Sequence, residues 1–220
     1  MAEHRSDDDV TPAITRRSFF TRAGLSALGT GSVLEAALAC TPEQQQAAPA
    51  PAPVRGVGPE PVPVELVVNG RRRSLTLAPS TTLVQALREG FGLLGTKVGC
   101  DRGACSACTV WVDGEVVASC MTFALDARGR TITTIEGLSR DGELHPVQQA
   151  FIDYDALQCG FCTPGMVMSC AALIDRQAGV GLEDVKTAVS GHLCRCGTYP
   201  NVIKATLAAA ARKRTGSSHG

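Results

Sequence analysis

One ten-residue stretch decides the fold of this chain: residues 99–108 read GCDRGACSAC and carry three cysteines. Cys120 follows twelve residues after the last of them, so the full pattern is C-x4-C-x2-C and then a fourth cysteine. A loop this dense in glycine and alanine lets the backbone wrap closely around a compact object, with peptide N–H groups pointing at the sulfurs. The stretch therefore predicts a loop built around one inorganic centre.

The spacing of these cysteines matches the plant-type [2Fe-2S] arrangement, in which four thiolates bind two irons and hydrogen bonds offset their negative charge. Two alternatives stay open. A zinc site more often shows paired C-x2-C knuckles, and disulfides would have to join cysteines within one tight loop. The spacing favours the iron–sulfur centre over both.

The residues around this loop predict a small sheet curled over one helix. Asn69–Gly70 and Asp113–Gly114 are typical turns of two β-hairpins. Thr81 or Thr82 can cap a short amphipathic helix that runs through Phe91. Alternating apolar and polar residues predict strands over residues 64–69, 73–77, 109–112, 115–117 and 130–135.

The second half of the chain has helical periodicity and a second group of cysteines. Helices are expected over residues 145–157, 164–176, 182–190 and 200–212, which suggests a compact bundle. Two turns between these helices read QCGFCTPG (158–165) and GHLCRCG (191–197). They contain a C-x2-C pair and a C-x-C pair, separated by 31 residues of sequence. On spacing alone, zinc remains a serious alternative for this group.

Composition sets limits on the class of protein. With 44% apolar and 19% charged side chains, 220 residues can bury one or two modest cores. Lys plus Arg and Asp plus Glu both number 21, so no net charge attracts nucleic acid, and we expect no nucleic-acid partner. The ten cysteines exceed what a buried-thiol core needs and fall short of a small disulfide scaffold.

The N-terminal residues 1–40 are interpreted as a twin-arginine signal peptide. Arg16 and Arg17 precede an aromatic pair and a mild Gly- and Ala-rich stretch that is too short to span a bilayer permanently. This route exports folded proteins, typically because a cofactor has been inserted first, so we expect a periplasmic location. Cleavage near Ala39 is expected; lipid attachment to Cys40 is the alternative, and only it would bring the chain to a membrane. Pro- and Ala-rich residues 41–62 predict a linker, and 214–220 a disordered tail.

Five segments together resemble the iron–sulfur subunit of the xanthine oxidase family of molybdenum hydroxylases. The resemblance covers about residues 62 to 212, and the leader on a separate small subunit most resembles exported periplasmic aldehyde oxidoreductases. It implies an α+β chain: a β-grasp ferredoxin-like domain over residues 63–139, then a four-helix-bundle [2Fe-2S]-binding domain over 140–213. The segments that carry it are Gly95–Lys97, Ile135–Leu138, His145–Gln148, Gln158–Gly165 and Cys194–Tyr199.

The resemblance also implies the ligands, cofactors and partners. Gln158 matches a position whose side chain approaches the molybdopterin cofactor, of the cytosine dinucleotide type, held by a large subunit; a glutamine that bonds its own loop is the alternative. Electrons would pass from the second cluster to the first and then to an FAD-binding subunit or a cytochrome. No catalytic residue is expected on this chain. The implied ligands are Cys100, Cys105, Cys108 and Cys120 for the first cluster and Cys159, Cys162, Cys194 and Cys196 for the second.

Some residues depart from the family pattern or stand outside it. Ser106 occupies a position where relatives usually have glycine, and it would be strained if its φ were positive. Cys170 is expected as a small buried side chain, and Trp111 as a sheet residue packing on the helix. The cluster Arg71–Arg73 is interpreted as a solvated surface that could also steer an electron acceptor.

Three functions remain under comparison. The first is the electron-transfer subunit of a molybdenum-dependent aldehyde oxidoreductase, with an N-heteroaromatic hydroxylase as its nearest variant. The second is a free-standing ferredoxin-like carrier, which would need one cluster and usually an acidic docking surface. The third is a binding module stabilised by zinc or disulfides, which would be colourless and would leave the twin-arginine leader without a purpose.

Overall fold

The computed structural model describes residues 58–216, with side chains through residue 213. The predicted leader, Cys40, most of the predicted linker and the end of the predicted tail lie outside the described residues. None of the helices within residues 58–216 combines the length and apolar character that a bilayer span requires.

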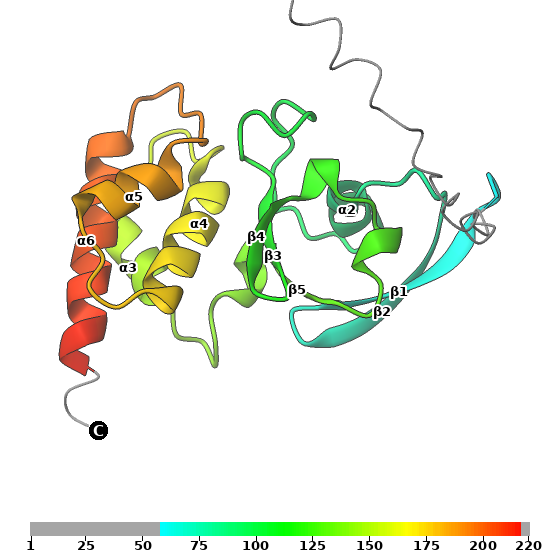
Figure 1. The fold of residues 1–220 in the computed structure, drawn as a ribbon, viewed down its shortest axis with the longest axis horizontal. Helices are drawn as coiled ribbons and strands as arrows, with labels where there is room; N and C mark the ends of the chain where they lie inside the picture. Colours follow the sequence, from blue (N-terminus) through cyan, green and yellow to red (C-terminus); the bar gives the residue numbers. More distant parts are fainter. Residues whose placement is uncertain (1–57, 217–220) are drawn as a thin grey trace, which may run out of the picture. The chain divides into compact units, whose positions relative to one another are not determined.

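A five-stranded mixed sheet forms the first half of the described chain (Figure 1). The strand order is β2-β1-β5-β3-β4, with β1 and β5 parallel and the other pairs antiparallel. Every second residue of β1 is buried, which is the pattern of a strand with one face on a core. The strands are β1 (Val62–Val68), β2 (Arg71–Leu77), β3 (Thr109–Val112), β4 (Glu115–Ala118) and β5 (Thr131–Thr133).

Both predicted hairpin turns are confirmed. Asn69 and Gly70 have φ of 51° and 74°, and Asp113 and Gly114 have φ of 51° and 79°, as the tight turns of twisted hairpins require. The strand predicted over 130–135 is too long. The Asn69 side chain accepts from the Thr134 N–H (2.9 Å) and donates to its hydroxyl (2.9 Å), so the chain leaves the sheet there.

The predicted helix under the sheet is present but changes its winding. It begins as α2 (Leu83–Gln85), where the Gln85 side chain accepts from the Thr82 N–H (2.9 Å), and continues as a π-helical turn, η3 (Ala86–Gly90). Its apolar side packs into the first core, in which Leu66, Leu83, Leu87, Val110 and Ile132 are fully buried.

The basic cluster, Arg71–Arg73, lies at the start of β2, directly after the Asn69–Gly70 turn. Arg72 pairs with Glu65 across the hairpin (2.6 Å), and the guanidinium of Arg73 lies 5.4 Å from the centre of the Phe91 ring. Arg71 and Arg72 are exposed, as predicted for a solvated surface, and only Arg73 is half-buried.

Four helices form the second half of the described chain: α3 (Pro146–Asp153), α4 (Thr163–Arg176), α5 (Leu182–Val189) and α6 (Tyr199–Gly216). The first ends earlier than predicted, because Asp155 takes a left-handed φ of 48° and the Ala156 N–H bonds to the Phe151 carbonyl. The last runs past the predicted end at Arg212. The second core includes Phe151, Met166 and Met168, all buried, with α4 lying between the sheet and the remaining helices (Figure 1).

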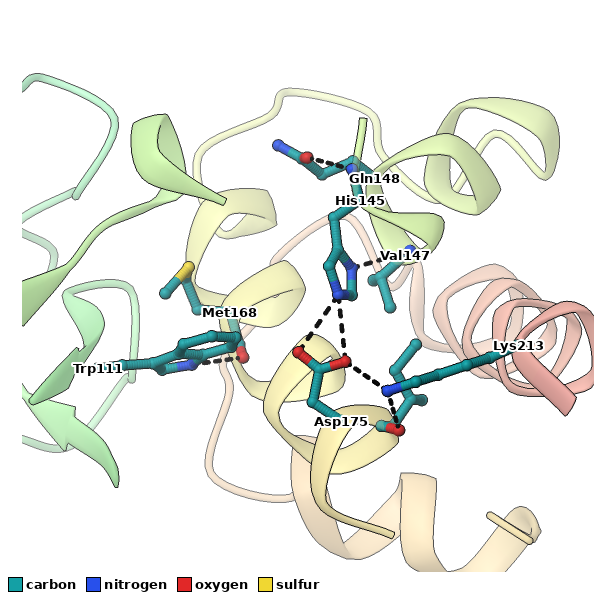
Figure 2. Close-up of polar contacts among 8 residues, drawn as sticks. Trp111, His145, Val147, Gln148, Met168, Asp175 and Lys213 are labelled. Atoms are coloured by element: carbon teal, nitrogen blue, oxygen red, sulfur yellow. Dashed lines mark hydrogen bonds and ion pairs between the residues drawn. The ribbon is translucent and has the colours of Figure 1, made fainter. Parts of the chain in front are cut away.

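Trp111 joins the two halves, and its predicted packing on the helix beneath the sheet is wrong. Its neighbours in β3, Val110 and Val112, point into the first core, so Trp111 faces the other side of the strand. There it packs against the second core, and its indole N–H donates to the Met168 carbonyl of α4 (2.9 Å; Figure 2). Arg176 of α4 also forms an ion pair with Glu115 of β4 (3.0 Å), which adds a second contact between the sheet and α4.

Candidate metal centres

The first four predicted ligands come together between η3 and β4. Cys100 and Cys105 are half-buried in the long loop before β3, while Cys108 and Cys120 are buried beside Val84. The Cys105 thiol acts on the pKa of Cys100, and both the Cys108 and the Cys100 thiols act on that of Cys120. The four thiols therefore lie close enough to influence one another.

Backbone N–H groups point at this first group of sulfurs. The Gly103 N–H donates to Cys120 Sγ (3.3 Å) and the Ala104 N–H donates to Cys100 Sγ (3.2 Å). A further N–H, that of Arg102, is the main cause that lowers the pKa of Cys100 to about 7, because it stabilises the thiolate. Burial, together with the neighbouring Cys108 thiol, raises the pKa of Cys120 to about 11.

The second group lies in the two inter-helix turns of the bundle. Cys162 is buried at the start of α4, and Cys194 and Cys196 are half-buried ahead of α6. Cys194 and the exposed Cys159 both lie close enough to Cys162 to act on its pKa. Burial and the Cys194 thiol raise the pKa of Cys162 to about 12.

The turn that carries Cys194 is fixed by the first residues of α6 and the residue just before it. Burial raises the pKa of Cys194, but hydrogen bonds from Thr198 outweigh it and bring the pKa to about 7. The Tyr199 hydroxyl accepts from the Cys194 N–H (2.8 Å) and donates to the His192 carbonyl (2.7 Å). Thr198 and Tyr199 therefore support the second group, a role that their sequence position in the Cys194–Tyr199 segment did not specify.

Both groups suit a two-iron cluster chemically. Four thiols in close proximity can all ionise only if a strongly cationic centre replaces their protons, and the N–H donors at Sγ atoms lower the energy of such thiolates. Within residues 58–216 no three His, Cys, Asp or Glu side chains are arranged to hold a single metal ion. A [2Fe-2S] cluster makes a different demand, since it spreads four thiolates over two irons.

The two groups are linked through the backbone. The Leu193 N–H, one residue before Cys194, donates to the Cys105 carbonyl (3.2 Å). The next residue of the first loop, Ser106, donates from its hydroxyl to the Gly191 carbonyl (3.0 Å). One hydrogen bond and a few covalent bonds therefore separate a sulfur-bearing residue of one group from a sulfur-bearing residue of the other.

Comparison with known proteins agrees with this arrangement. Residues 66–132 match the model of a 2Fe-2S iron-sulfur cluster binding domain, and residues 134–207 match that of a [2Fe-2S] binding domain. The nicotine 6-hydroxylase small subunit of Paenarthrobacter nicotinovorans is 45% identical over 144 residues, which are 66% of this chain and 87% of that protein. This chain belongs to the iron–sulfur small subunits of the molybdenum hydroxylase family.

Two further proteins are similar to this iron–sulfur subunit. The aldehyde oxidoreductase iron-sulfur-binding subunit PaoA of Escherichia coli O157:H7 is 42% identical over 155 residues, 64% of this chain and 68% of that protein. The crystal structure of quinoline 2-oxidoreductase from Pseudomonas putida 86 has a chain that is 38% identical, with a TM-score of 0.67 over 71% of this chain and 98% of that chain. The subunit is an electron-transfer, iron–sulfur component of an oxidoreductase complex.

The remaining predicted residues of the iron–sulfur subunit have the following places. Gln158 is exposed in the turn after α3, and its side chain makes no hydrogen bond within the described residues, so it does not bond its own loop. Its approach to a pterin stays a prediction. Cys170 is fully buried in α4, as expected, and burial raises its pKa to about 11. Ser106 has a φ of 57°, which is the strained case anticipated from the sequence.

A polar network at the start of α3 holds the helices of the subunit together (Figure 2). His145 Nδ1 accepts from the Val147 N–H (3.2 Å), and its Nε2 lies 3.4 Å from Asp175 of α4. Lys213 of α6 reaches the same carboxylate (2.7 Å). Burial raises the pKa of Asp175, but its hydrogen bonds from His145 and Lys213 outweigh burial and hold the pKa at about 2.

Proposed function

We propose that this subunit carries two [2Fe-2S] clusters that pass electrons from the molybdenum cofactor of a large subunit to FAD or another acceptor. The first cluster is held by Cys100, Cys105, Cys108 and Cys120, and the second by Cys159, Cys162, Cys194 and Cys196. The observation that carries the proposal is the backbone contact between the two groups, the Leu193 N–H on the Cys105 carbonyl (3.2 Å).

The work of this chain's own residues follows from that arrangement. When bound, the molybdenum cofactor on the partner supplies the hydroxylation itself, which takes oxygen from water and releases two electrons and two protons. The cysteines hold the centres that carry these electrons one at a time. The N–H groups of Gly103 and Ala104 stabilise negative charge on sulfur, and burial of Cys108, Cys120 and Cys162 keeps water from the inner sulfurs.

The partner surface is proposed to lie around the exposed cysteine turns. Phe161 is 49% and Leu193 62% exposed beside the second group, and Met121 is 64% exposed beside the first. Large apolar side chains at this exposure around a functional centre are typical of a surface that a partner covers. Cys159 and Gln158 lie in the same exposed turn, so we infer that electrons enter at the second cluster, where Gln158 approaches a molybdopterin of the cytosine dinucleotide type, and leave from the first.

The substrate of the whole complex is proposed to be an aldehyde. The support is the similarity to the Escherichia coli aldehyde oxidoreductase subunit, together with the leader interpreted from Arg16 and Arg17. The second candidate is an N-heteroaromatic compound, which the similarity to the nicotine 6-hydroxylase and quinoline 2-oxidoreductase chains favours. Export of the folded subunit to the periplasm by the twin-arginine route belongs to the proposal as well.

Cysteine replacement with iron and sulfide analysis tests the cluster assignment. The purified complex should contain four irons and four sulfides on this chain and two distinct S = ½ EPR signals after dithionite reduction, which is what two clusters require. Cys159→Ser should lose one signal and about half of the iron while the other signal persists. Cys170→Ala is the matched control, because this buried cysteine is outside both groups, and it should retain all the iron.

Zinc or intact disulfides in a colourless, EPR-silent protein would overturn the proposed function. Loss of both signals in Cys159→Ser would overturn the division of ligands into two groups. Loss of iron in Cys170→Ala equal to that in Cys159→Ser would show that iron content follows general stability instead of the assigned ligands.

A further inference from the structure

Ser106 lies where the two cysteine-bearing loops meet, and it holds an unusual backbone conformation. Its φ is 57°, in the left-handed region that favours glycine. It sits between Cys105 and Cys108 in the first loop. A side chain in this conformation costs free energy that glycine would save, so the serine needs a compensating interaction.

The hydroxyl and the carbonyl of Ser106 supply such interactions. Its Oγ donates to the Gly191 carbonyl (3.0 Å), 85 residues further along the chain, in the turn that leads to Cys194. Its carbonyl accepts from the Thr109 hydroxyl (2.7 Å) and the Thr109 N–H (3.3 Å). Ser106 is therefore fixed on one side to its own loop and on the other to the helical half of the chain.

The surroundings leave little room for this residue to shift. A Cβ added at Gly165, in the first turn of α4, would come closer than 3.0 Å to the Ser106 carbonyl oxygen. A Cβ added at Gly191 would lie 3.3 Å from Ser106 Oγ, closer than most real Cβ contacts. Two glycines thus let the helical half approach Ser106 on both sides.

The neighbouring residue makes this contact functionally relevant. The Cys105 carbonyl accepts from the Leu193 N–H (3.2 Å), and this hydrogen bond is the backbone link between the two groups of cysteines. We propose that Ser106 is a positioning residue: its hydroxyl, by holding the Gly191 turn, keeps the Cys105–Leu193 link closed and fixes the distance between the two clusters. This inference rests on the proposed function, since it assigns the serine a role in coupling the two centres.

Two substitutions separate this role from a merely conformational one. Ser106→Gly removes the hydroxyl and also relieves the left-handed strain, whereas Ser106→Ala removes the hydroxyl and keeps the strain. If the serine only shaped its own loop, Ser106→Gly would keep the Leu193–Cys105 hydrogen bond at least as stable as in the natural protein. If the serine hydroxyl closes this link, both variants lose the hydrogen bond.

The direct measurement is hydrogen exchange at the Leu193 amide in the purified complex. Both variants should exchange about fivefold faster there, which is the effect of losing one ordinary hydrogen bond between the loops. Ser190→Ala is the matched control: it removes a serine hydroxyl that also bonds a backbone carbonyl, that of Thr187 (2.8 Å), but at the C-terminal end of α5 and not between the loops, so the Leu193 rate should stay unchanged. Ser106→Gly exchanging at the natural rate would refute the inference.

The second measurement is the magnetic interaction between the two reduced clusters in EPR. Dipolar splitting falls with the cube of the distance, so it should weaken in both Ser106 variants while four irons per chain are retained. Unchanged splitting with full iron would overturn the coupling role even if exchange changed. A natural protein without iron would instead overturn the proposed function, and the exchange comparison would still decide whether the hydroxyl holds the loops together.

Discussion

Gly165→Ala should destabilise the protein, although the same change stabilises most helices. Gly165 is in the first turn of α4, and alanine is favoured over glycine inside a helix by up to about 1 kcal/mol. Here the new Cβ would come closer than 3.0 Å to the Ser106 carbonyl oxygen and to 3.3 Å from Ala107 Cα. Both are backbone atoms, so no flexible side chain can move away.

The magnitude follows from setting these two effects against each other. Forcing a methyl group into a packed contact costs about 1–3 kcal/mol, and the propensity gain returns up to about 1 kcal/mol. The difference is a net loss of about 0–3 kcal/mol, and its middle range of about 1–2 kcal/mol lowers Tm by about 2–8 °C for a domain of this size. The strain is relieved by moving α4 away from the first cysteine loop, so the spacing of the two groups should change as well.

Differential scanning calorimetry at one scan rate, with an EPR spectrum of each reduced sample, tests this reasoning. Gly181→Ala is the matched control, because its Cβ would meet nothing closer than Asp184 Oδ2 at 3.5 Å and its position before α5 predicts a loss of only about 0.5 kcal/mol. A Tm for Gly165→Ala equal to or above that of the natural protein would refute the close packing of α4 against the first cysteine loop.

Three further predictions concern other parts of the chain. Trp111→Phe removes the indole N–H on the Met168 carbonyl and should lower Tm by about 2–4 °C, from a loss of about 1 kcal/mol; an unchanged Tm would contradict the interdomain role of the tryptophan. Asp175, with its pKa held at about 2, stabilises the fold above pH 4 and loses that contribution as pH falls through 2. Asp175→Asn should therefore lower the Tm at pH 7, and paired circular-dichroism melts should show the difference from the natural protein shrinking between about pH 4 and 2. Replacing Arg16 and Arg17 with lysine should keep the protein in the cytoplasm, and unimpaired export in cell fractionation would remove the leader interpretation.

The elements that the sequence determined are those set by local chemistry. The Asn69–Gly70 turn fixes its hairpin because only residues that tolerate positive φ fit such a turn, and the structure has it as predicted. The cysteine spacing predicted a glycine-rich loop with N–H groups directed at sulfur, and the Gly103 and Ala104 N–H groups are so directed. Both patterns lie within a few residues of chain, where backbone conformation follows from residue type.

Element ends were less predictable because distant residues decide them. The strand predicted to continue to residue 135 stops at Thr133, since the Asn69 side chain, 65 residues away, binds the backbone and hydroxyl of Thr134. The helix predicted through residue 157 stops at Asp153, because Asp155 turns into the left-handed region. A periodic apolar pattern carries no information about such contacts.

The sequence alone determined two cysteine patterns, two kinds of secondary structure and the family that combines them, because each of these is written in short-range spacing. Only the tertiary structure decided how the halves meet. Trp111 reaches Met168 across 57 residues and Ser106 reaches Gly191 across 85. The first contact forms because Val110 and Val112 fill the first core, which leaves the opposite face of β3 to pack against α4. The second forms because two glycines, Gly165 and Gly191, let α4 and the Cys194 turn approach the first loop closely. Packing between distant segments, which no local pattern encodes, therefore sets the relation between the two candidate metal centres.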